Sequence, residues 1–149
     1  MSDIKEFQGE YRWLSNFWPV EVVFDFITYP SIEHAYQAAK TRNIVAREAF
    51  RNCTAGEAKR MGRTLNIRED WEAVKLVVME GLLRQKFLTP HFREKLLATG
   101  DCQIIEGNKW GDTFWGVCRG KGENHLGKLI MGIREELRMT TNPHADGEG

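Results

Sequence analysis

The chain has 149 residues, of which 42% are hydrophobic, 28% charged and 11% aromatic, a profile typical of one soluble globular domain. Its 21 Lys and Arg residues balance 21 Asp and Glu residues, so zero formal charge argues against indiscriminate binding to polyanions. No apolar run approaches the ~20 residues that a bilayer requires, and the first residues lack the apolar segment of a signal peptide. We therefore expect a cytoplasmic protein that makes no membrane contact.

The three cysteines, Cys53, Cys102 and Cys118, are odd in number and widely spaced, so a disulfide framework is not expected. No set of Cys and His residues has the spacing of zinc ligands, and the sequence predicts no bound metal. Buried free thiols are the expectation for all three. A nucleophilic Cys118 is the alternative, because the Gly- and cation-rich segment around it favours a thiolate.

The first predicted element covers residues 20–29, whose side chains alternate between two faces as in one strand or a tight strand pair. Pro30 ends it, and Ser31 can cap the helix that follows. Periodicity and capping patterns predict helices over about 32–40, 45–52, from Thr54 onward, 68–87, 90–98 and from Asn124 onward.

Short strands are expected over residues 102–106 and 113–117, around a Gly- and Asn-rich turn. Helices outnumber strands and do not alternate with them as βαβ units, so the predicted fold class is α+β, mainly helical, in a single compact domain. This domain is expected over residues 1–139, and the polar residues 140–149 are expected to form a flexible tail.

One candidate site lies on the first predicted helix, where Glu33, Gln37 and Lys40 are spaced by four and three residues. That spacing places them on one helical stripe, beside strongly aromatic segments where the wall of a cleft would be. The alternative is a solvated helix face that carries a weak ion pair.

A second candidate is the segment 106–116, which combines one glutamate, two tryptophans and three glycines. Such a loop suits the close approach of a flat ligand, although a β-turn with its Trp side chains in the core is the alternative. The glycines of 119–128 lead into a helix N-terminus, which is a weak signal for phosphate binding.

Charge is distributed unevenly, because residues 40–63 hold seven cations against two anions. The excess could bind a pyrophosphate or a nucleic-acid backbone, whereas a solvated basic helix face is the alternative. The cations are Lys40, Arg42, Arg47, Arg51, Lys59, Arg60 and Arg63.

Several strings follow one another in an order that is specific to one family. They are WLSNFWP at 13–19, YPSIEHAYQAAK at 29–40, a helix with Trp71, Lys75 and Met79 that ends in Lys86 and Phe87, LLATG at 96–100, GDTFWG at 111–116 and NHLGKLIM at 124–131. On these strings, which span most of residues 6–138, the chain resembles the NADAR or YbiA-like proteins, named for association with NAD and ADP-ribose.

The resemblance implies a mainly helical α+β domain that needs no cofactor or metal. It also implies an N-glycosidase that hydrolyses the bond between ribose C1 and an amino nitrogen. Two substrate classes go with the family: ADP-ribose attached to the amino group of guanine in DNA or RNA, and early ribosylated intermediates of riboflavin biosynthesis. The implied partner is thus a nucleotide sugar resembling ADP-ribose, and a non-catalytic module that binds ADP-ribose or NAD is the alternative.

Candidate residues follow from the chemistry that the resemblance implies. Breaking a ribosyl C–N bond builds positive charge on C1 and negative charge on the nitrogen, so it requires a carboxylate and a proton donor. Glu33 and Asp112 are the predicted carboxylates, and Lys40 and Lys75 are lysines that could capture the opened sugar as a Schiff base. The predicted substrate-binding residues are Asn16, Phe17, Trp18, His34, Gln37, Trp110, Trp115, Gly116 and Asn124.

Overall fold

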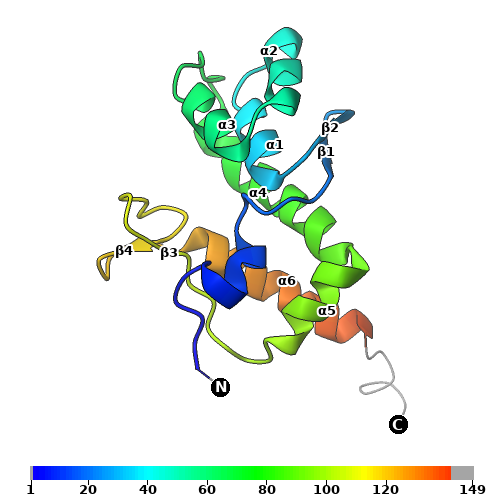
Figure 1. Ribbon diagram of the computed structural model, residues 1–149, viewed down its shortest axis with the longest axis vertical. Helices are drawn as coiled ribbons and strands as arrows, with labels where there is room; N and C mark the ends of the chain where they lie inside the picture. The colour runs from blue at the N-terminus through cyan, green and yellow to red at the C-terminus, as the bar shows by residue number, and fades with distance from the viewer. Residues whose placement is uncertain (1, 142–149) are drawn as a thin grey trace. The chain divides into compact units, whose positions relative to one another are not determined.

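The computed structural model describes residues 2–141 (Figure 1). It divides into a central unit, Ser15–Lys86, and a terminal unit formed by the two ends of the chain, Met1–Leu14 and Phe87–Gly149. Helices dominate and the strands are two or three residues long, which confirms the prediction of a mainly helical α+β fold. Among the described residues, none of the helices combines the length and apolar character needed to cross a bilayer.

A tight antiparallel hairpin opens the central unit, as one reading of the alternating pattern predicted. Strand β1 (Val22–Phe24) pairs with β2 (Ile27–Tyr29), and Val22 lies opposite Tyr29. The two turn residues, Asp25 and Phe26, both have a positive φ, of 47° and 68°. Two consecutive residues in this region match the right-handed twist of the flanking strands.

The helices that follow the hairpin are α1 (Ile32–Ala38), α2 (Ile44–Ala49), the 3-10 helix η2 (Phe50–Asn52), α3 (Ala55–Gly62) and α4 (Trp71–Leu88), whose last two residues belong to the terminal unit. Helices α1 and α3 begin where local capping predicts, whereas α4 begins at Trp71 and not at the predicted residue 68. The Ser31 side chain accepts a hydrogen bond from the His34 backbone N–H, and Thr54 with Glu57 forms a complete capping box.

Helix α1 is the centre of this unit, since all seven of its residues are buried. It packs against α3 and against both strands of the hairpin (Figure 1). A short helix that is covered in this way must bury polar side chains as well as apolar ones. This burial determines the chemistry of the candidate site.

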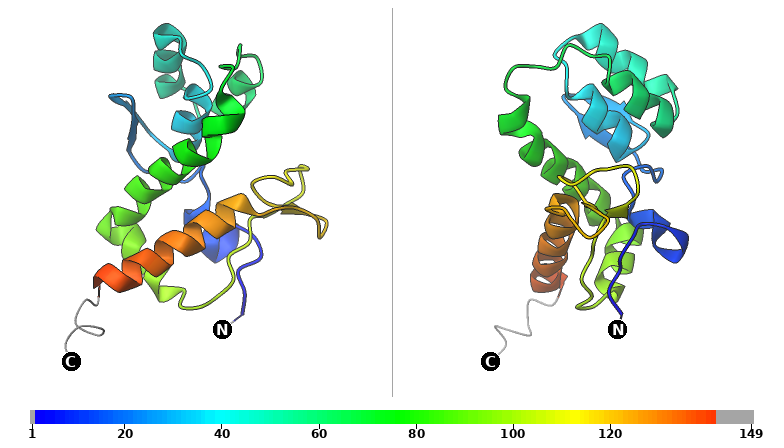
Figure 2. Two further views of the ribbon diagram at one scale, coloured as in Figure 1. Left: turned by 180° about the vertical axis from the view of Figure 1, so that it is seen from behind. Right: turned by 90° about the vertical axis from the view of Figure 1, so that its left-hand side faces the viewer.

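The terminal unit is built around two helices, α5 (Pro90–Ala98) and α6 (His125–Thr141), which lie side by side in both views of Figure 2. The N-terminal segment joins this unit through a bridge between Ile4 and Ile104. Its other elements are the 3-10 helix η1 (Gly9–Leu14) and a parallel pair of β3 (Gly107–Asn108) and β4 (Val117–Cys118).

The strands predicted over 102–106 and 113–117 are much shorter in the structure. Only one residue of each, Ile104 and Val117, forms a β-bridge. Between Ile104 and Val117 the chain forms a loop that side-chain hydrogen bonds of Asn108 and Asp112 stabilise, and it forms no extended strand pair. Of the tail expected from residue 140, Thr140 and Thr141 belong to α6, and residues 142–149 lie outside the described part of the chain.

Lys86 lies in the last turns of α4 with none of its surface exposed. Its Nζ donates a hydrogen bond to the backbone oxygen of Ser15 at 3.0 Å. Because burial disfavours the charged amine, the pKa of Lys86 falls to about 7.

We expect the free energy of unfolding to rise between pH 7 and pH 9 relative to that of a Lys86→Met variant. Over this range the unfolded lysine keeps its proton, since its ordinary pKa is about 10.4, whereas the folded lysine loses it. The unfolded state then binds more protons, so stability rises with pH by up to about 1.4 kcal/mol per pH unit. Urea unfolding of both proteins at pH 7, 8 and 9 measures the difference. Equal slopes would show that Lys86 stays protonated in the fold.

Candidate active site

Glu33 stands in the first turn of α1, where the Ser31 cap orders the backbone. Its own backbone N–H donates to the carbonyl oxygen of Asn16 at 3.0 Å. The residue is only 8% exposed, and this burial raises the pKa of its carboxyl group. A hydrogen bond from Gln37 and the positive charges of Lys59 and Lys40 oppose the rise.

Gln37 holds the Glu33 carboxylate from one turn further along α1. Its Nε2 donates to Glu33 Oε2 at 2.7 Å, and the residue is 5% exposed. Among the described residues, Gln37 Oε1 is buried without a hydrogen-bond partner. Glu33 and Gln37 therefore share one buried face of α1, and the alternative of a solvated helix face is wrong for them, whereas Lys40 lies beyond the end of the helix.

Lys40, which follows α1, brings an amine to the same group. Burial lowers its pKa, the negative charge of Glu33 opposes this, and the nearby charges of Lys75, Arg63 and Lys59 lower it further. A lowered pKa increases the share of neutral amine at neutral pH, the form that acts as a nucleophile or accepts a proton.

Aromatic rings border the group of Glu33 and Lys40. The Lys40 Nζ lies 5.5 Å from the centre of the Tyr36 ring, and that ring tilts against Trp71 with centroids 5.1 Å apart. Phe17 is 42% exposed, and Lys59 Nζ lies 5.9 Å from its ring centre. The sequence predicted Phe17 here, but it counted Lys59 only as one member of a basic stretch.

Lys75, the second predicted lysine, is engaged with its own helix. Its Nζ lies 2.8 Å from Glu72 Oε1, one turn earlier on α4. It is near enough to Lys40 for its charge to lower the pKa of that amine. The structure thus brings both predicted lysines together and distinguishes their environments.

Three predicted binding residues of the central unit have contacts inside the protein. The ring of His34 is hydrogen-bonded at both nitrogens, to Ser31 Oγ at 2.6 Å and to the Cys53 carbonyl oxygen at 2.7 Å. Asn16 Nδ2 lies 3.6 Å from Met79 Sδ, and its buried Oδ1 has no partner among the described residues. Trp18 is half-buried. The contacts give His34 an anchoring role, and ligand contact by these three residues stays a prediction.

Asp112 belongs to the terminal unit, where it organises the loop between β3 and β4. Its Oδ1 accepts hydrogen bonds from the backbone N–H groups of Phe114 and Trp115 at 3.1 and 2.9 Å. Its own backbone N–H donates to Asn108 Oδ1 at 3.0 Å. These contacts fix a turn, and a catalytic role for Asp112 stays a prediction.

The other predicted residues of this unit surround the same loop. Trp110 is 57% exposed, Trp115 is half-buried, and Gly116 is buried so closely against the backbone of Glu106 that no side chain fits. Asn124 ties the loop to the unit, since its Oδ1 accepts from the Glu106 N–H and its Nδ2 donates to the Ile104 carbonyl. The sequence-predicted residues therefore form two groups, one in each unit.

The basic stretch, residues 40–63, presents less unpaired positive charge than its composition indicates. Arg42 pairs with Glu69 and Asp70, Arg47 with Asp25, and Arg51 with Glu48. By contrast, Arg60 on α3 and Arg63, directly after it, are exposed. Helix α3 is thus the part of the stretch best placed to meet an anion.

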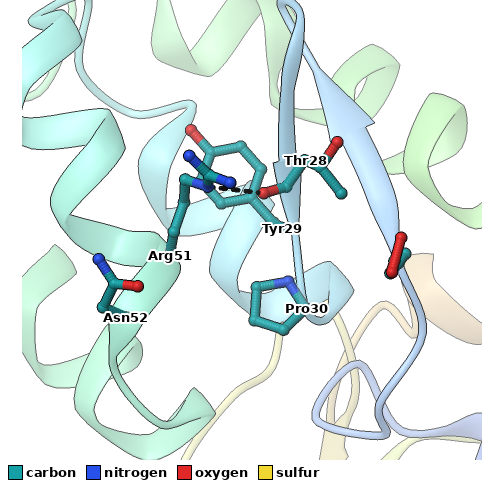
Figure 3. Close-up of a pocket in the computed structure, with 6 residues that line it drawn as sticks. Thr28, Tyr29, Pro30, Arg51 and Asn52 are labelled. Carbon is teal, nitrogen blue, oxygen red and sulfur yellow. Dashed lines mark hydrogen bonds between the residues drawn. The ribbon is translucent and has the colours of Figure 1, made fainter.

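A shallow pocket of about 200 Å³ lies beside the hairpin (Figure 3). Arg51 reaches across it, and its Nε donates to the Thr28 carbonyl oxygen at 3.2 Å. Its lining residues are Glu21, Thr28, Tyr29, Pro30, Arg51 and Asn52. None of them is among the predicted catalytic or substrate-binding residues, although Arg51 belongs to the basic stretch over residues 40–63. Within the described residues, no cluster of three or more His, Cys, Asp or Glu side chains could hold a metal ion.

Comparison with known proteins adds independent information. The family model of the NADAR domain matches residues 4–138. The N-glycosidase YbiA of Escherichia coli is 40% identical over 137 residues, covering 87% of this chain and 84% of that protein. The N-glycosidase Npun_R5314 of Nostoc punctiforme is 38% identical over 138 residues, covering 86% of each chain.

Two further similarities extend this picture. A riboflavin biosynthesis protein of Vibrio vulnificus, VVA0006, is 38% identical over 131 residues, which are 84% of this chain but 35% of that protein. The NMR structure of E. coli YbiA superposes with a TM-score of 0.83 at 35% identity, covering 97% of this chain and 90% of that one.

Proposed function

Because the chain belongs to the NADAR domain family and is an N-glycosidase, we propose that it uses Glu33 to cleave the bond between ribose C1 and an amino nitrogen. The observation that carries the proposal is the buried Glu33 carboxylate, held by Gln37 at 2.7 Å near the amine of Lys40. A module that only binds a nucleotide sugar needs no such buried acid and amine.

In the proposed reaction, the C1–N bond breaks and leaves positive charge on C1. The negative Glu33 carboxylate stabilises that positive charge, and the stabilisation is strong because little water reaches the side chain. Water adds to C1 and gives up a proton, and the leaving nitrogen takes up a proton. The amine of Lys40 then exchanges a proton with Glu33; in a covalent route the amine attacks C1 itself, and water later releases the sugar from it.

For the substrate, we propose ADP-ribose attached to the amino group of guanine in DNA or RNA. The exposed ring of Phe17 offers a surface on which a base can stack, a contact worth about 1–3 kcal/mol. Lys59 and Arg60 of α3, with Arg63 directly after it, supply positive charge for a pyrophosphate or a nucleic-acid backbone.

A second candidate is a ribosylated pyrimidine intermediate of riboflavin biosynthesis. It is favoured by the similarity to the Vibrio vulnificus protein, whose name refers to that pathway. This substrate carries the same ribose C1–N bond, so Glu33 would serve it in the same way. Binding this small substrate requires less positively charged protein surface than binding a nucleic acid does.

Parallel incubation with the two substrates distinguishes these candidates. One sample contains an oligonucleotide with ADP-ribosylated guanine, and the other contains the pyrimidine ribosylamine. Mass spectrometry identifies the bond that is cut, and release of free ADP-ribose with unmodified guanine is the expected result. Cleavage of neither substrate, together with tight binding of ADP-ribose, would contradict the proposal and favour the binding module.

If α3 contacts nucleic acid, we expect binding of the modified oligonucleotide to weaken steeply as salt rises. Each phosphate contact that is removed should lower the slope of log K against log[salt] by about 1. The Arg60→Ala/Arg63→Ala variant should therefore show a flatter slope, measured by fluorescence anisotropy on an inactive background. Arg51→Ala is the matched control, because Arg51 already binds Glu48 and Thr28. An unchanged slope in the double variant would show that these arginines only solvate the surface.

A further inference from the structure

Gly62, in the last turn of α3, lies directly against the Gln37 amide. A methyl group at the Gly62 Cα would overlap Gln37 Oε1 and would lie 2.8 Å from its Cδ and 3.4 Å from its Cγ. Real Cβ atoms are essentially never found within 3.0 Å of other heavy atoms, so the first two of these contacts are too close. Either the side chain of Gln37 or the whole of α3 would have to move to admit the methyl group.

The backbone does not explain a glycine at this position. Gly62 is absent from the residues with a positive φ and lies inside a regular helix. Glycine destabilises a helix interior relative to alanine. A glycine that is needed inside a helix is therefore needed for close packing against a neighbouring group.

Other helical glycines lack this contact. At Gly56, in the same helix, the nearest atoms to a Cβ would be Arg60 at 3.8 Å and Thr54 at 4.0 Å. At Gly81, in α4, a Cβ would meet nothing within 4 Å. Gly127, in α6, is also closely packed, but against Ile104 and Asn124. What distinguishes Gly62 is its neighbour, since it faces the glutamine that binds Glu33.

We propose that Gly62 is a positioning residue: by leaving room only for the Gln37 amide, it holds that amide in hydrogen-bond contact with the Glu33 carboxylate. Gln37 is buried, so a displaced amide cannot swing freely into solvent. The inference rests on the proposed function of Glu33 and assigns to α3 the control of that residue's orientation and charge.

Loss of the hydrogen bond between Gln37 and Glu33 should move the activity to higher pH. The hydrogen bond from Gln37 lowers the pKa of Glu33, against the larger raising effect of burial. Losing the bond therefore raises the pKa further, and the charged form of Glu33 is reached only at higher pH. Activity that depends on this charge then appears at higher pH as well.

The test compares Gly62→Ala with Gly56→Ala, which adds the same methyl group to the same helix where there is room. In Gly62→Ala we expect kcat to fall at least tenfold near neutral pH, and the acidic limb of the kcat profile to move to higher pH. KM should change less than kcat, and Gly56→Ala should match the wild type. Matching profiles in the two variants would overturn the inference.

A second background keeps the test informative if Gly62→Ala folds poorly. Gln37→Ala removes the atoms that the methyl group would strike, so Gln37→Ala/Gly62→Ala should fold and share the pH profile of Gln37→Ala alone. A further shift or loss on adding Gly62→Ala would show that Gly62 acts otherwise, and would overturn the inference. Failure of the proposed function is separate, since it appears as full turnover in Glu33→Gln.

Discussion

Replacing Glu33 by Gln should lower kcat by at least a hundredfold while the protein remains folded. The amide keeps the size of the side chain and can still accept the hydrogen bond from Gln37. It lacks the negative charge that stabilises the positive charge on C1. A hundredfold loss corresponds to about 2.7 kcal/mol of transition-state stabilisation. Steady-state kinetics on the substrate that proves to be cleaved measures the effect.

Stability separates a catalytic role for Glu33 from a structural one. The buried carboxylate has a raised pKa, so the fold disfavours its charge, and Gln at this position should leave Tm unchanged or raise it. Affinity for ADP-ribose should change little. Glu94→Gln, at an exposed position of α5, is the matched control and should keep full turnover. An active Glu33→Gln protein would move the catalytic role to Asp112 or to a lysine.

Elements that depend on neighbouring residues were predicted well from the sequence. The Ser31 cap and the capping box of Thr54 and Glu57 act within one helical turn, so their pattern contains the whole interaction. The strand pair over 20–29 is also local, because two turn residues set its register. The strand expected over 113–117 forms only at Val117, because Asp112 binds the backbone amides of Phe114 and Trp115 that a strand ladder would use.

Spacing on one helix also predicted the group of Glu33, Gln37 and Lys40, but not its burial. The burial arises because α3 and the hairpin both pack against α1, a contact between segments that no local pattern encodes. The same holds for Gly62, for which a glycine inside a helix was the available signal. The basic stretch was overestimated because residues far along the chain, such as Asp25 and Glu69, neutralise its arginines.

Replacing Lys40 by Met should also lower kcat by at least a hundredfold, for a different reason. Methionine keeps much of the apolar stem near Tyr36 but removes the amine, whose lowered pKa suits it to proton transfer or to attack on C1. Lys128→Met, at an exposed position of α6, is the control for the loss of one positive charge and should keep full activity.

Two measurements assign the role of Lys40 among the lysines around it. Borohydride added during turnover reduces any imine between an amine and the opened sugar to a stable secondary amine, and peptide mass spectrometry locates it. In the covalent route the adduct lies on Lys40 and is absent from Lys40→Met. In the proton-transfer route no adduct forms, although Lys40→Met still loses kcat. Lys75→Met should instead raise the pKa of Lys40, because the positive charge of Lys75 helps to lower it, and should shift the pH profile upward with a smaller loss of kcat. An adduct on Lys75, or a greater loss of kcat in Lys75→Met than in Lys40→Met, would assign the reactive amine to Lys75 and leave Lys40 as its charged neighbour.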